Sequence, residues 1–150
     1  MKRFGFRLQK VLNYREGIEE QRQAMLARAI EAVQAQQQEV EQLDRLAAEA
    51  MAEVRRLGNK KVDIQALMQG QAHLGAIRRR VGIAVEHLRA MELRFEEARQ
   101  GFVNARKDRR ALELLRGQRA TEYERETGLQ EQKELDEIGS RPWQLERKAE

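Results

Sequence analysis

The sequence predicts an all-α fold, namely an antiparallel two-helix coiled-coil hairpin whose second helix is longer than the first. One observation is a heptad of apolar pairs that begins at Leu67 and continues to Ala105. Such a repeat holds one face of a helix against a partner helix. The others are a break with turn residues at 58–63 and the replacement of the apolar pair by Arg116 and Arg119. We therefore expect the partner helix to end where the heptad ends.

The first helix should span residues 6–57, an interval without proline and with one interior glycine. Apolar residues recur there in steps of three and four, as on one buried helix face. They are Leu8, Leu12, Leu26, Ala29, Val33, Val40, Leu43, Ala47, Ala50, Val54 and Leu57. Four polar residues interrupt this face, and we expect them to loosen the packing locally. They are Arg15, Glu19, Arg22 and Gln36.

The turn and the second helix follow at residues 58–63 and 64–138. Gly58 suits the left-handed backbone that often ends a helix. Asp63 is a good residue for the N-cap of the next helix. The apolar face of this helix is given by its heptad pairs. They are Leu67/Gly70, Leu74/Ile77, Val81/Ala84, Leu88/Met91, Phe95/Ala98 and Phe102/Ala105.

The unequal helices predict an overhang. A short turn makes the helices antiparallel neighbours, so the first helix should run out opposite residue ~115. Residues 116–138 then form a helix without a partner. Pro142 should end the regular structure, and we expect residues 140–150 to be a disordered tail.

Composition limits the function classes. Charged residues make up 36% of the chain and aromatic residues 5%, which is typical of a long helix or coiled coil. A two-helix seam encloses no pocket, so we expect no enzyme active site. The chain has no cysteine, which excludes disulfides and thiolate metal sites. With neither a signal-peptide pattern nor a long apolar run, the sequence favours a cytoplasmic protein.

Charge is unevenly distributed. Residues 58–120 carry a net charge of +7 and residues 121–150 carry −4. The middle of the chain therefore suits an acidic partner, and its end suits a basic one.

No cluster of residues predicts catalysis or cofactor binding. His73 and His87 are 14 residues apart, too far to hold one metal ion from a single helix face. The sequence has no glycine-rich phosphate loop. The basic runs at 78–80 and 106–110 are open to three interpretations: a solvated helix face, a protein-docking surface or a nucleic-acid contact. Because no aromatic residues interleave with these runs for base stacking, we expect no nucleic-acid partner.

The N-terminal string Lys2–Arg7 has two interpretations. Its basic and aromatic residues could touch a membrane surface. Alternatively, Phe4 and Phe6 could cover the open end of the hairpin.

Three strings outside the heptad resemble a known family. They are FGFRLQKVLNYRE at 4–16, ALELLRGQRATEYERE at 111–126 and EQKELDEIG at 131–139. Together they resemble the FliJ family of flagellar export proteins, and the resemblance covers nearly the whole chain. It implies a coiled-coil stalk, similar in form to the central stalk of rotary ATPases, that acts without cofactors.

The resemblance also implies partners and a location. The partners are the hexameric flagellar export ATPase, a membrane export-gate protein and export chaperones. The location is the cytoplasmic side of the inner membrane at the flagellar base, with peripheral association.

Two sets of contact residues follow from the resemblance. For the ATPase, we place the contact at the open end of the hairpin: Phe6, Leu8, Arg116, Arg119, Tyr123, Gln132 and Asp136. For the export gate, the family implies a patch early in the second helix: Leu67, Met68, Gln71, Leu74 and Ile77. Since three of the latter belong to the predicted seam, Met68 and Gln71 are the better contact candidates.

Other functions remain open from the residues alone. A structural coiled-coil tether has the same heptad, and a basic nucleic-acid-associated coiled coil has a similar charge. Two copies could also pair in crystals through Val11, Ile18 and Met25, which widen the apolar stripe of the first helix.

Overall fold

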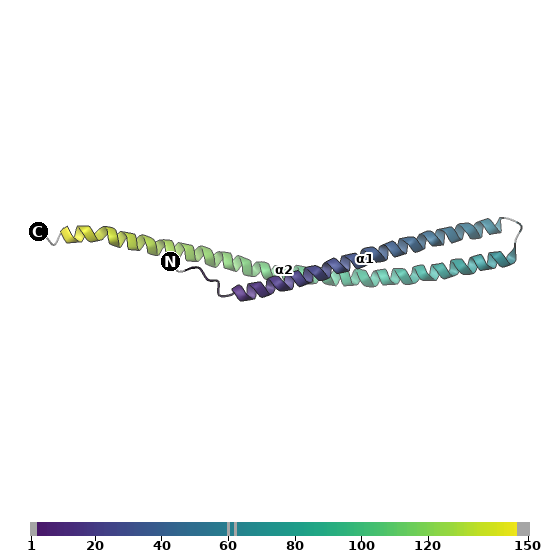
Figure 1. Cartoon of the computed structure of the whole chain (residues 1–150), viewed down its shortest axis with the longest axis horizontal. Helices are drawn as coiled ribbons and strands as arrows, with labels where there is room; N and C mark the ends of the chain where they lie inside the picture. The colour runs from purple at the N-terminus through teal and green to yellow at the C-terminus, as the bar shows by residue number, and fades with distance from the viewer. Residues whose placement is uncertain (1–2, 60, 62, 147–150) are drawn as a thin grey trace. The chain divides into compact units, whose positions relative to one another are not determined.

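The computed structural model describes residues 3–59, 61 and 63–146, with side chains up to residue 140. This part of the chain holds two α-helices and no strand: α1, Gln9–Gly58, and α2, Ile64–Glu146. The two helices run antiparallel on either side of the loop between them (Figure 1). Helix α1 has 50 residues and α2 has 83. The predicted all-α hairpin with a longer second helix is confirmed.

The chain divides into two compact units. The loop unit comprises Glu20–Asn104 and contains the connection between the helices. The terminal unit comprises Met1–Glu19 and Ala105–Glu150. Each unit contains a part of α1 and a part of α2.

The heptad positions of α2 form the packed face of the loop unit. Ala50 of α1 packs with Leu74 and Ile77 of α2 in a buried cluster, against which Val54 and Val81 also pack. Every residue of the predicted heptad pairs is buried or half-buried. Every residue of the predicted α1 stripe is also buried or half-buried. The predicted seam is therefore confirmed on both helices.

Two polar residues on this face have partners on the facing helix. The Gln36 side chain is only 7% exposed, and its Nε2 donates a hydrogen bond of 3.0 Å to the carbonyl oxygen of Ala84. The Arg22 side chain lies over Gly101. A Cβ added at Gly101 would be 3.5 Å from Nη1 of Arg22. The small residue on the facing helix leaves room for the long polar one, so each interruption has a specific partner.

The same holds in the terminal unit. Leu12 is fully buried there. Arg15 forms an ion pair with Asp108, with 3.3 Å between Nη1 and Oδ2. Glu19 forms an ion pair with Arg109. Pairing across the helices replaces apolar contact where the heptad weakens.

Helix α1 begins at Gln9, three residues later than predicted. The amide of Gln9 donates a hydrogen bond to the carbonyl of Phe6 at 3.0 Å. The amide of Leu12 donates one to the carbonyl of Leu8 at 2.9 Å. Residues 3–6 precede the helix and have no regular secondary structure. Glycine at position 5 disfavours a helix, and both phenylalanines of this segment are half-buried outside one.

The connection between the helices confirms one expectation and corrects another. The Asp63 carboxylate accepts hydrogen bonds from the amides of Gln65 and Ala66 at 3.1 and 3.4 Å, so Asp63 is the N-cap of α2. Gly58, however, belongs to α1, and no described residue has a positive φ. Gly58 and Asn59 therefore do not adopt the predicted left-handed backbone, and residues 60 and 62 of the turn lie outside the described part.

Helix α2 ends at Glu146, beyond the predicted residue 138. The expectation of a disordered tail is therefore corrected for residues 140–146, and residues 147–150 lie outside the described part. Proline in a helix interior removes one backbone hydrogen bond and its ring crowds the carbonyl four residues earlier, so α2 continues past Pro142 at a local cost in stability. The residues after Pro142 include Gln, Leu and Glu, which are good helix formers. We call residues 128–146 the arm.

Candidate docking surfaces

The predicted ATPase-contact residues all lie in the terminal unit, but they differ in exposure. Phe6 and Leu8 are half-buried just before the start of α1. Arg116 and Arg119 are exposed on α2, and Arg119 pairs with Glu122 at 3.1 Å. Gln132 and Asp136 are exposed on the arm; Tyr123 is half-buried.

The sequence predicted that Tyr123 lies on a stretch of helix without a partner. The structure corrects this prediction. Its ring packs against the ring of Phe4, with 5.6 Å between centroids and 48° between planes. Ala120 and Thr127, on the same side of α2, are half-buried too. An extended residue advances about twice as far as a helical one. The few residues before α1 therefore cover more of α2 than a continued helix would.

A cluster of ion pairs joins α1 to α2 at Glu19, about three turns from the start of α1. The Arg109 guanidinium donates to the carboxylates of Glu19 and Glu113, and Nη1 lies 2.6 Å from the Glu113 oxygen. These hydrogen bonds, first the one to Glu19, raise the pKa of Arg109 above its ordinary value, against a smaller opposing effect of burial. The cluster joins α1 to α2 and also braces one turn of α2.

The part of the arm from residue 128 to residue 140 is exposed on all sides. Every side chain from residue 128 to residue 140 is exposed, including Leu129, Leu135 and Ile138. This stretch has four acidic residues and one basic residue, Lys133. None of its side chains forms an ion pair with another described residue. The arm therefore presents an acidic helix with single apolar side chains.

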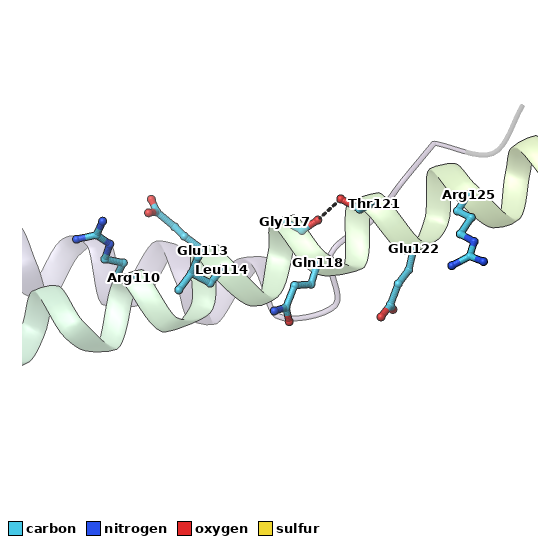
Figure 2. Close-up of a pocket in the computed structure, with 8 residues that line it drawn as sticks. All are labelled: Arg110, Glu113, Leu114, Gly117, Gln118, Thr121, Glu122 and Arg125. Carbon is cyan, nitrogen blue, oxygen red and sulfur yellow. Dashed lines mark hydrogen bonds between the residues drawn. The ribbon is translucent and has the colours of Figure 1, made fainter.

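A groove that sequence reasoning missed lies on α2 of the terminal unit (Figure 2). Leu114 and Gly117 lie near its middle, and Arg110 and Arg125 lie at its two ends. The Thr121 hydroxyl donates a hydrogen bond of 3.0 Å to the Gly117 carbonyl, which turns this hydroxyl toward its own helix. The signal was the i, i+3, i+7 spacing of residues 114, 117 and 121 on the face opposite the heptad.

The predicted gate patch is split by burial. Leu74 and Ile77 are buried in the cluster of the loop unit, and Leu67 is half-buried. Met68 is 64% exposed and Gln71 is exposed. Only these last two offer most of their side chains to a partner.

The basic run at 78–80 is exposed, and the run at 106–110 is exposed except for the half-buried Arg109. Arg78, Arg79 and Arg80 form no ion pair within the described part of the chain. His73 and His87 are exposed as well. Among the described residues, no group of three or more His, Cys, Asp or Glu side chains could hold a metal ion. Nor does either described helix contain an apolar stretch of the length that a bilayer requires.

Comparison with known proteins identifies a family. The model of the family described as flagellar FliJ protein matches residues 4–148. No curated protein and no solved structure gives a significant match. The family match includes both helices, the segment before α1 and the arm. The chain therefore belongs to the flagellar FliJ protein family.

Proposed function

We propose that this chain is a stalk-like accessory protein that docks on the hexameric flagellar export ATPase and promotes its activity. The arm and the exposed arginines next to it would make this contact. The opposite end of the hairpin, with Met68 and Gln71, would face the membrane export gate, and the protein would also escort export chaperones. Contact with the gate would hold it at the inner membrane.

Family membership supports the general role. FliJ proteins are non-catalytic components of flagellar export, so the chain has a role in that process. The proposal adds the partner, the direction of the effect and the surfaces.

The exposed arm is the observation that carries the proposal. Isolated helices are marginally stable in water, because packing supplies most of the stability of helices in proteins. In the arm, residues 128–140 lack packing against described residues and offer acidic and apolar side chains together. Such a helix gains most from a binding partner. Charge pairs at its surface would set register, and apolar side chains would anchor it.

The test is the ATPase rate of the purified hexameric export ATPase with and without this chain. Full-length chain should raise the rate, and chain truncated after Thr127 should not. The truncation leaves the ring contact of Tyr123 in place. Circular dichroism should show that the remaining hairpin unfolds at nearly the same temperature as the full chain.

A single charge reversal separates the role of the arm from the effect of shortening. Asp136→Arg in the full chain should weaken the stimulation. Asp44→Arg is the matched control, because Asp44 is exposed and forms no ion pair with a described residue. Full stimulation by the truncated chain would rule out the arm as the ATPase contact.

A further inference from the structure

The segment before α1 covers part of α2 that would otherwise be open. Residues 3–6, which we call the strap, belong to the terminal unit together with α2 residues 105–146. The Phe4 ring lies 5.6 Å from the Tyr123 ring. Phe4 and Tyr123 are both half-buried.

The covered face adjoins the proposed ATPase contact. Arg119 and Arg116 lie about one and two turns before Tyr123 on α2, and the arm begins at residue 128, just after it. Tyrosine and arginine are the residues that most often anchor protein interfaces. A partner that grips this stretch of α2 would reach Tyr123 only after the strap has moved.

Few contacts hold the strap. Arg3 and Gly5 are exposed, and an added Cβ at Gly5 would meet nothing within 4 Å. No hydrogen bond links residues 3–5 to another described residue. Segments with so few contacts open at low free-energy cost. Glycine before the anchored Phe6 allows the backbone to turn there.

We propose that the strap is an autoinhibitory cover that is closed over Tyr123 in the free chain and displaced when the export ATPase binds. The proposal rests on the proposed function, because it assigns Tyr123 to the same ATPase contact. The apparent affinity for the export ATPase equals the affinity of the open form multiplied by the fraction of molecules in which the strap is open. The strap therefore sets a threshold for docking.

Removing the Phe4 ring tests the direction of the effect. In a binding titration with the purified export ATPase, Phe4→Ala should bind roughly 2- to 10-fold more tightly than the natural chain. That range corresponds to the usual contribution of one aromatic pair. Tyr14→Ala is the matched control, because Tyr14 is an exposed aromatic residue of the same unit. Its affinity should equal that of the natural chain.

A fluorescent variant follows the strap itself. In Phe4→Trp with Trp143→Phe, the new indole is the only tryptophan of the chain. Its emission should be that of a half-buried ring in the free chain and should shift to longer wavelength when the ATPase is added. Equal or weaker binding by Phe4→Ala, or an unchanged emission on binding, would overturn the inference while the proposed function stands. If the natural chain did not bind the export ATPase, both the inference about the strap and the proposed function would be overturned.

Discussion

Gln36 shows how single polar residues define the pairing of the two helices. Its side chain is buried in the seam and donates to the Ala84 carbonyl on the facing helix. Because the Ala84 carbonyl belongs to one particular turn of α2, the hydrogen bond forms only when Gln36 lies opposite that turn. A buried polar residue in a coiled coil commonly favours one register over its alternatives, at some cost in stability.

The Gln36 bond can be tested by two substitutions. Gln36→Ala should lower the free energy of unfolding by about 1–2 kcal/mol, because a buried hydrogen bond and its side-chain packing are lost. Gln36→Leu should stay within about 1 kcal/mol of the natural chain, since apolar burial offsets the lost bond. Urea unfolding measures both, with exposed Gln37→Ala as the control. If Gln36→Ala and Gln37→Ala behaved alike, the hydrogen bond would have no role in stability.

The helical glycines divide into two kinds. At Gly70 an added Cβ would lie 3.4 Å from Val54 Cγ2 and 3.5 Å from Leu57 Cδ1. At Gly82 it would meet nothing within 4 Å. Gly82→Ala should therefore raise the free energy of unfolding by about 0.5–1 kcal/mol through helix propensity.

A larger side chain sharpens this contrast. Gly82→Leu should be tolerated, whereas Gly70→Leu should cost about 1–3 kcal/mol by displacing Val54 and Leu57. Thermal unfolding of the three variants measures the difference. A loss of stability in Gly82→Ala would mean that this face of α2 is packed.

At the scale of the elements, the large residues of the α2 heptad should carry much of the hairpin's stability. Phe102 is half-buried, so Phe102→Ala should cost about 2–3 kcal/mol, below the usual range for a fully buried ring. Leu93→Ala is the control, because Leu93 is 67% exposed and should change stability by less than about 0.5 kcal/mol. Equal effects at the two positions would place the packed face elsewhere on α2.

Helix type, packed face and the two helix ends next to the loop followed from the sequence, whereas the start of α1 and the end of α2 did not. The heptad from Leu67 to Ala105 reports local periodicity, which a sequence displays directly. The strap depends on a contact between Phe4 and Tyr123, residues far apart in the chain. Periodicity carries no signal for such a contact in a segment without a helix. The end of α2 differs from the prediction because the helix continues through Pro142.

At the scale of the whole chain, the candidate sites were predicted less completely than the fold. The resemblance led to Arg116, Arg119, Gln132 and Asp136, which are exposed, and also to Leu74, which is buried. A leucine in the seam and a leucine in a contact surface look alike in a sequence. Only their burial in the structure distinguishes them. The groove around Leu114 lies on the face opposite the heptad, where the apolar repeat gives no signal.

Charge along the whole chain agrees with two different partners. Residues 58–120 carry +7 and residues 121–150 carry −4. Long-range attraction mainly raises association rates and weakens as salt is added. ATPase binding through the acidic arm should therefore slow at higher salt, as stopped-flow mixing would measure. An association rate that does not change with salt would leave the arm without an electrostatic role.

The most direct test of the central claim, that the arm is the ATPase contact, is hydrogen exchange of the full chain with and without the hexameric export ATPase. In the free chain, amides of residues 128–140 should exchange far faster than those of residues 67–112, because only the latter pack against α1. Adding the ATPase should slow exchange in the arm and leave residues 64–77 unchanged. Slower exchange confined to residues 64–77, with no change in the arm, would contradict the account and place the ATPase at the opposite end of the hairpin.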